Sequence, residues 1–222
     1  MLKYLLCVLC LLWIAPSVTA QDAVKTLPDN YKIAFENEYV RVTRVHYGPH
    51  AKLPGHTHTA LACAYVYLND SGPVAFKHVG AAYGAVTRKP TRARSYRLYR
   101  GIDEIHEVEN PSPLPSDFLR VEFKTDPVDP KSLRGVFLPP PASSEPAARV
   151  EFENAQLRVS RLAVPSGQRL VVSTADHPSL LVSLTPGEDG KVIWLAAGQA
   201  FTLDHESSAG REALRFELKT AR

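Results

Sequence analysis

Two histidines two positions apart give this sequence its clearest chemical signal. In Gly55-His56-Thr57-His58 the two imidazoles share one face of an extended strand, because successive strand side chains point to opposite sides. One divalent metal ion can then bind both. A third histidine, His106, follows 48 residues after His58 in another alternating segment, residues 106–110. Three neutral imidazoles suffice to hold a divalent ion and leave coordination positions open for water or substrate.

Short alternating segments are the elements that we expect to position these histidines. Residues 40–45, 119–123 and 157–161 alternate apolar with polar side chains, as half-buried strands do. The chain has 18 prolines and one methionine, and no stretch shows helical periodicity. Many short strands indicate an all-β sandwich or barrel. A closed antiparallel barrel is one way to bring the distant histidines together with their side chains pointing inward.

An internal repeat organises the chain. Residues 35–44 recur as residues 152–161, a displacement of 117 positions, and residues 119–124 match residues 214–219, a displacement of 95 positions. Matching beginnings and ends favour two equivalent units, although repeat-like strands can also belong to one larger sandwich. The smaller second displacement means that the first unit holds 22 more residues, and we place this insertion around residues 77–96.

The segment between the units reads as a connector. Residues 125–146 contain two Asp-Pro pairs and three consecutive prolines beginning at Pro139, a composition that favours an extended linker over a strand or helix. The predicted organisation is therefore a signal peptide at 1–20, a first repeat at 21–124, a proline-rich linker at 125–146 and a second repeat at 147–222.

The N-terminus has the pattern of a secretory signal peptide. Lys3 precedes an apolar run at residues 5–15, followed by Pro16 and the small-residue ending Val18-Thr19-Ala20. That run is shorter than the roughly 20 residues of a membrane helix, so we expect a periplasmic or secreted protein with no stable membrane insertion. Cys63 is then the only thiol of the mature chain. The formal net charge of +3 gives no reason to expect nucleic-acid binding.

The order of the motifs resembles the cupin superfamily. Its first motif contains H-x-H followed by a Glu, and its second contains H-x-x-x-N before a turn; here these are His56 with His58, and His106 with Asn110. The resemblance covers both repeats and implies a bicupin with two RmlC-like jelly-roll barrels. It also implies a divalent metal ion (Fe, Mn, Ni, Cu or Zn) and a dioxygenase-type reaction, because three-histidine centres occur in some cupin dioxygenases.

Three positions depart from the family pattern. Cys63 stands where the family has its metal-binding Glu, and His50 replaces the glycine that precedes the first histidine by six residues. The P-x-G-x-x-H of the second motif is loosened to Gly101 followed by His106. Losing the carboxylate leaves a more positive site, which would polarise an anionic ligand more strongly. Cys63 is a candidate fourth ligand, since a thiolate binds Zn or Fe well. The alternative is a small buried residue on a strand.

Three further charged residues are candidates for the site. Glu104 shares the predicted inward face of His106 and is a candidate catalytic acid or base or an additional ligand; an exposed carboxylate at a loop edge is the alternative. Arg92 and Arg94 belong to a basic segment, residues 88–100, that has no acidic residue and could attract an anionic substrate at the barrel mouth. A solvated loop leading into an edge strand is the alternative. We interpret His78 as a surface or rim residue.

The second unit lacks these histidines. Ser173 and Ala175 occupy the positions equivalent to the H-x-H pair, and Phe201 occupies that of the third histidine. We therefore expect a structural second repeat that covers the first barrel or builds a homodimer surface. Two functions remain open: a metal-dependent, dioxygenase-type enzyme acting on a small anionic or oxygen-rich molecule, and a non-catalytic cupin that binds a small ligand.

Overall fold

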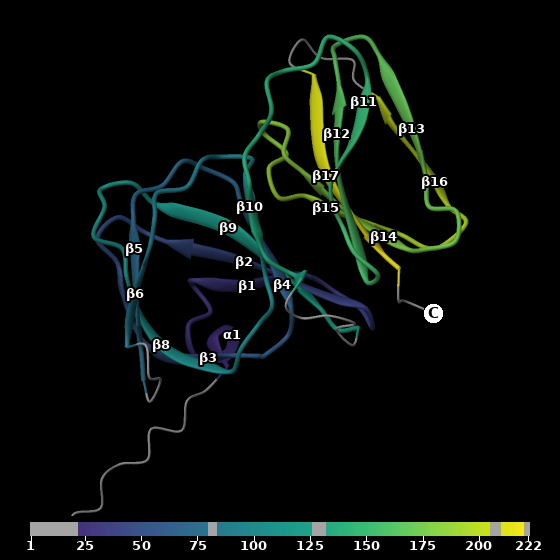
Figure 1. The fold of residues 1–222 in the computed structure, drawn as a ribbon. Coiled ribbons are helices and arrows are strands. Elements are labelled where there is room, and N and C mark those ends of the chain that lie inside the picture. Colours follow the sequence, from purple (N-terminus) through teal and green to yellow (C-terminus); the bar gives the residue numbers. More distant parts are fainter. Residues whose placement is uncertain (1–21, 80–83, 126–131, 205–209, 220–222) are drawn as a thin grey trace, which may run out of the picture.

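The computed structural model describes residues 22–79, 84–125, 132–204 and 210–219 of the 222-residue chain. The predicted signal peptide lies outside these described residues. Apart from one helical turn, α1 (Ala23–Thr26), the elements are β-strands gathered into two units that lie side by side (Figure 1). In the described part of the chain, no helix has the length and apolar character needed to cross a membrane.

The first unit consists of two antiparallel sheets that enclose a core. The larger sheet has the order β1-β2-β9-β4-β7-β10, and the smaller has the order β3-β8-β5-β6. Side chains from both sheets, such as Tyr47, Phe118 and Val108, pack between them. The strands are β1 (Tyr31–Glu36), β2 (Val40–Tyr47), β3 (Lys52–His58), β4 (Cys63–Tyr67), β5 (Val74–His78), β6 (Ala85–Arg88), β7 (Tyr96–Tyr99), β8 (Glu104–Glu109), β9 (Ser116–Phe123) and β10 (Gly135–Phe137).

The second unit repeats this plan with fewer strands. Its larger sheet has the order β11-β12-β17-β14-β15, and a separate pair, β13-β16, forms the other side. The strands are β11 (Ala147–Glu153), β12 (Leu157–Val164), β13 (Arg169–Ser173), β14 (Ser179–Ser183), β15 (Val192–Leu195), β16 (Ala200–Asp204) and β17 (Arg211–Leu218). Leucine and valine side chains from both of its sheets form one cluster inside this barrel, so its interior is apolar where the first barrel carries its histidines.

The extra residues of the first unit form the β5–β6 hairpin. The sheet orders of the two units correspond strand by strand, except that β5, β6 and the edge strand β10 have no counterpart among the described strands of the second unit. This hairpin spans residues 74–88 and overlaps the insertion predicted around residues 77–96. Its first strand pairs with β8, the strand that carries His106. The insertion therefore adds side chains directly beside the histidine site.

The repeated residues build the same hairpin in both units. Asn37 and Asn154, at equivalent positions, each accept a backbone hydrogen bond across the first turn, at 2.9 and 2.7 Å. Lys124 and Lys219 then close the two hairpins by donating to the glutamate that precedes each asparagine, at 2.7 and 2.9 Å. Each first strand also has a β-bulge at the same place. The repeat thus preserves a folding module and not a ligand site.

The predicted linker contributes a strand to the first unit. β10 lies within residues 125–146 and pairs with β7 at the edge of the larger sheet, so the prediction of a connector without a strand is wrong for this part. The short run Val136-Phe137-Leu138 lies among prolines and gives little strand signal. It pairs because the open edge of β7 offers unsatisfied backbone groups, and Phe137 stacks on Tyr96 at 4.6 Å between ring centroids.

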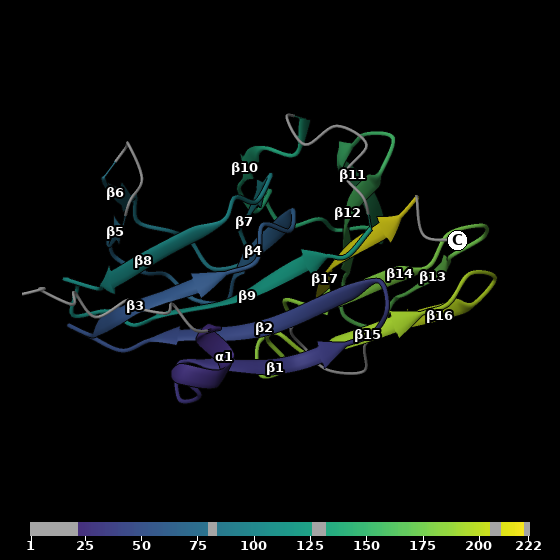
Figure 2. The ribbon, with the colours of Figure 1, turned by 90° about the horizontal axis from the view of Figure 1, so that it is seen from below.

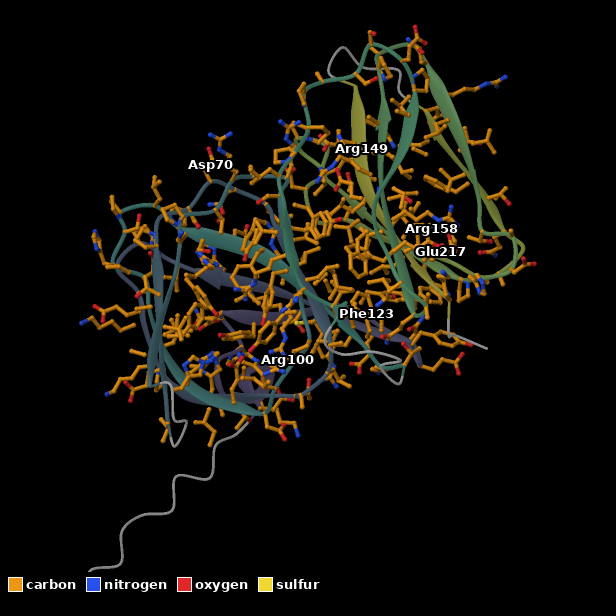
Figure 3. The ribbon with its side chains drawn as sticks, in the orientation of Figure 1. Asp70, Arg100, Phe123, Arg149, Arg158 and Glu217 are labelled. Atoms are coloured by element: carbon orange, nitrogen blue, oxygen red, sulfur yellow. The ribbon has the colours of Figure 1, made fainter. Side chains whose placement is uncertain are left out.

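The two larger sheets pack face to face, and this contact forms the main core. Val42, Leu119 and Phe123 of the first unit meet Leu214 and Phe216 of the second, and all five are buried. Figure 3 shows Phe123 between the two barrels, and Figure 2 shows the large sheets on adjoining sides. Of the strands predicted as half-buried, residues 119–123 are therefore buried on both faces, whereas residues 40–45 keep Arg44 exposed.

Candidate metal centre

Three histidines converge inside the first barrel. His56 and His58 on β3 and His106 on β8 each offer a ring nitrogen, and these atoms lie within 4.8 Å of one another. Their ring centroids are 4.8 to 5.0 Å apart. This cluster, which we call the histidine triad, unites residues that are 48 positions apart in sequence.

Strand register explains the convergence. β3 pairs with β8 so that His56 lies opposite His106, and β5 pairs with the other edge of β8 so that His78 also lies opposite His106. In the neighbouring row, His58 lies opposite Glu104. Because alternate residues of a strand face the same side, all five side chains share the inner face of the smaller sheet.

The state of the histidines fits a metal ion. Burial lowers the pKa of His56 to about 4 and lowers that of His58 well below its usual value, so both rings are neutral at physiological pH. His106 is buried, and neither of its ring nitrogens has a hydrogen-bond partner in the described part of the chain. Buried polar atoms are rarely left unpaired, so a bound cation is the natural partner for this ring.

Hydrogen bonds orient His56 for metal binding. Its Nδ1 lies 2.9 Å from the carbonyl oxygen of Pro54, which can only accept, so Nδ1 carries the proton and Nε2 keeps its lone pair. The Tyr31 hydroxyl lies 2.8 Å from that Nε2 and 2.9 Å from the Tyr47 hydroxyl. Burial raises the pKa of both tyrosines, to about 12 for Tyr47, so both remain protonated donors.

Glu104 and His78 form a buried pair next to the triad. Glu104 Oε2 lies 3.0 Å from His78 Nε2 and 3.7 Å from His106 Nδ1, and less than a tenth of either partner side chain is exposed. Burial would raise the pKa of Glu104, but contact with His106 and His78 outweighs it and gives a net lowering. Glu104 is therefore an ionised, inward-facing carboxylate, suited to act as a base or a ligand. His78 is likewise interior, contrary to its interpretation as a surface or rim residue.

Cys63 stays apart from the metal-binding groups. It lies on β4, in the larger sheet, while the triad lies on the smaller one. Its sulfur does not join the histidine nitrogens in either cluster of potential ligands found among the described residues. Burial raises the pKa of its thiol, which disfavours the thiolate. These findings agree with the alternative of a small buried strand residue.

The backbone conformation is unusual at two motif positions that carry no metal ligand. His50, at the usual glycine position of the first motif, adopts φ of 54°, in the region that favours glycine. Gly101 before β8 has φ of 74°, and a side chain there would lie 2.2 Å from the carbonyl oxygen of Leu61. His50 lies in the turn just before β3, and Gly101 lies in the segment that leads into β8.

The triad opens into a cavity of about 570 Å³. Aromatic rings form much of its wall, and three inward-facing arginines, Arg88, Arg97 and Arg120, add positive charge. Arg92 also lines the cavity. Arg94 does not: its guanidinium donates to Glu212 of the second unit at 2.8 Å. The basic segment, residues 88–100, does bring positive charge to the cavity, as predicted, through Arg92 among others. Arg94 instead contacts the second barrel.

Arg88 and Arg97 differ from Arg120 in lacking a carboxylate partner. Arg120 lies 3.3 Å from Glu122, whereas neither of the other two forms an ion pair with a described residue. Arg88 donates to the hydroxyls of Ser71 and Ser116, and Arg97 stacks over the rings of Tyr65 and Tyr99, at 4.7 and 5.3 Å. The Nε atoms of both are buried without a partner. Uncompensated buried cations are costly, so these two groups are poised for an anion.

Sequence reasoning missed Tyr31, His78, Arg88 and Arg97 as parts of the site. Tyr31 lies outside both motifs, and the spacing rule that found His56 and His58 works only within one strand. His78 reaches the triad through pairing between strands, which leaves no fixed spacing in the sequence. Arg88 and Arg97 belong to the basic segment, but the sequence does not show which of its arginines face the cavity. That needs the strand bounds, which place Arg88 at the end of β6 and Arg97 within β7.

Comparisons with known proteins place the fold. No protein-family model and no curated protein matches the chain. Among solved structures, YhhW from Escherichia coli matches with a TM-score of 0.57 and 14% identity over 86% of this chain and 90% of that one. Its complex with nickel(II), described as a bacterial pirin, gives 0.55 and 13% over 86% and 91%. Oxalate decarboxylase gives 0.56 and 10% over 90% and 72%.

These likenesses, together with the sheet topology, define the class of fold. The chain has the cupin fold in its two-barrel form, as the sequence predicted, and it is all-β in both units. The first barrel carries a three-histidine group that fits a metal site.

Proposed function

We propose that this protein is an exported metal-binding cupin that takes up a small organic anion in its first barrel. The observation that carries the proposal is the histidine triad, with His106 buried and both of its ring nitrogens unpartnered. Export is proposed from the N-terminal sequence pattern described above.

A divalent ion held by His56, His58 and His106 would supply Lewis-acid or redox chemistry at open coordination positions. The surrounding residues have their own roles. Occupation of His56 Nε2 would free the Tyr31 hydroxyl to donate to a ligand bound beside it. Glu104, being ionised, can take up a proton from that ligand.

Positive charge without counter-ions argues for an anionic ligand. Arg88 and Arg97 reach the cavity with no carboxylate partner among the described residues, and next to the triad only Glu104 would partly offset a dication. Tyr65, Tyr67 and Phe118 offer flat apolar surfaces next to these arginines. A carboxylate attached to a small ring or chain matches both features. We propose Arg88 and Arg97 as its principal contacts, with Arg92 at the rim.

The reaction class that we favour is a dioxygenase-type oxidation, on the resemblance of the three-histidine set to such centres. A non-catalytic cupin that only binds the anion is the second candidate, favoured by the hydrogen bond that Tyr31 already makes to His56. Turnover of a carboxylate with oxygen consumption by the metal-loaded protein would separate the two.

Replacing His56 and His58 together by Ala is expected to remove one metal ion per chain, because a single remaining imidazole holds a divalent ion weakly. Elemental analysis of the mature protein after dialysis against Co²⁺ measures this. His46→Gln, on the exposed face of β2, is the matched control and should keep the wild-type metal content. Equal metal content in the double variant and the wild type would contradict the proposal.

Arg97→Met is expected to weaken binding of benzoate to the metal-loaded protein by about 10- to 100-fold, since a charge-assisted contact is worth about 1.5–3 kcal/mol. The same variant should be at least as stable as the wild type without ligand, because an uncompensated buried cation is removed. Thermal shift with benzoate, and with benzyl alcohol as the uncharged control, measures both effects. Wild-type affinity for benzoate in the variant would exclude Arg97 as an anion contact.

A further inference from the structure

We propose that His78, Glu104 and His106 form a second cation site beside the histidine triad, so that His106 binds one ion through each ring nitrogen. The inference rests on the proposed function only because the two sites share His106. The two sites differ in every other ligand, and one of them depends on the inserted β5–β6 hairpin.

The spacing of the three side chains suits a metal ion. His78 Nε2 and Glu104 Oε2 are 3.0 Å apart, and Glu104 Oε2 and His106 Nδ1 are 3.7 Å apart. Two ligands at about 2.1 Å from a tetrahedral ion stand about 3.4 Å from each other, so these distances bracket the expected value. All three ligand atoms lie within 4.8 Å of one another.

The hydrogen bond at His78 Nδ1 leaves its Nε2 free to act as a ligand atom that faces Glu104. His78 Nδ1 lies 3.1 Å from the carbonyl oxygen of Gly84, which makes Nδ1 the donor and leaves a lone pair on Nε2. That lone pair faces Glu104 Oε2, 3.0 Å away. Two acceptors in contact need a cation between them. A proton would satisfy this pair alone, whereas a metal ion would also satisfy the unpartnered Nδ1 of His106.

The fold gives His106 a neighbour on each side. Its strand, β8, lies between β3 and β5, and His106 lies opposite His56 on one and His78 on the other. An imidazole with both nitrogens unpartnered, buried between two ligand groups, can bridge them as an imidazolate, with its one ring proton released to solvent when the second ion binds. The negative charges of the imidazolate and of Glu104 then offset the second dication, so the total charge equals that of one dication on three neutral imidazoles.

The donor set indicates the kind of cation. Two imidazoles and one carboxylate suit Zn²⁺, Co²⁺, Fe²⁺ or Ni²⁺, while Ca²⁺ and Mg²⁺ prefer ligand sets made only of oxygen. A first-row transition-metal ion is therefore the occupant that we assign to this second site.

Equilibrium dialysis against Co²⁺, with bound metal counted by elemental analysis, tests the proposal on the full mature chain. We expect two ions per chain in the wild type and in the surface control His46→Gln. We expect one ion in His56→Ala/His58→Ala, one in His78→Gln/Glu104→Gln, and none in His106→Ala. The thermal unfolding midpoint of each variant shows that it is folded, and the visible absorption of Co²⁺ should differ between the two one-ion variants.

The outcomes separate this site from the triad. One ion in the wild type that is lost in His56→Ala/His58→Ala but kept in His78→Gln/Glu104→Gln overturns the second site and leaves the proposed function standing. One ion that is kept in the first double variant and lost in the second supports the second site and overturns the triad as the metal centre. No ion in the folded wild type overturns both.

Discussion

A chain that ends before residue 147 is expected to fail to give a soluble, folded first barrel. The deletion would expose one whole face of the larger sheet, including Val42, Leu119 and Phe123, each at most 2% exposed in the intact chain. A contiguous apolar face of this kind drives aggregation. Expression of residues 21–146 followed by size-exclusion chromatography and circular dichroism measures the outcome.

A single substitution measures the same contact more finely. Phe216 packs against Phe123 and Tyr96, with ring centroids 6.0 and 6.3 Å apart, and is fully buried. Phe216→Ala is expected to lower the free energy of unfolding by about 3–5 kcal/mol, through lost burial and the cavity left behind. Val171→Ala, at a position that is 63% exposed, is the control and should change the free energy of unfolding by less than about 0.5 kcal/mol in urea unfolding.

For the truncation, a soluble first barrel that still binds metal would contradict the prediction. It would show that the first unit folds without the second.

Arg161→Met is expected to destabilise the chain by about 3–5 kcal/mol, because it leaves the buried carboxylate of Glu151 without its cation and Glu212 with Arg94 alone. The Arg161 side chain is 2% exposed and lies 2.9 Å from Glu151 and 2.6 Å from Glu212. It also donates to the backbone carbonyl of Arg94 at 3.0 Å, so it fastens the basic segment of the first unit to the second. Urea unfolding followed by tryptophan fluorescence measures the change.

The exposed pair of Arg41 and Glu36 provides the comparison. Both side chains are more than a quarter exposed and lie 3.0 Å apart, and exposed ion pairs contribute about 0–1 kcal/mol. Arg41→Met should therefore have a small effect. Equal effects of the two substitutions would mean that burial of the Arg161 cluster does not determine its contribution.

Metal content and anion affinity probe different parts of the same cavity. Loss of metal in the His56 and His58 double variant reports on the triad, and weakened benzoate binding in Arg97→Met reports on the cationic wall. Because Arg97 belongs to neither cluster of potential metal ligands, its substitution should leave the metal content unchanged. Arg94, which contacts Glu212, should affect stability and not benzoate binding.

Sequence reasoning succeeded where the information is local or repeated. The H-x-H pair follows from the two-residue period of a strand, and the repeat with its change in offset located the inserted hairpin. The signals for His106 and for the missing histidines of the second unit also came from order and spacing. The cupin resemblance added the barrel that brings these strands together, and the fold agrees with it.

The sequence by itself therefore determined the two-unit all-β plan, the three histidines and their restriction to the first unit. The tertiary structure decided which other groups reach them. His78 joins the site because β5 pairs with β8, Tyr31 because β1 closes the barrel beside His56, and Arg97 because its strand faces inward at that position. Contacts between strands depend on register and on which face a second sheet covers, and neither is written in the spacing of residues along one strand.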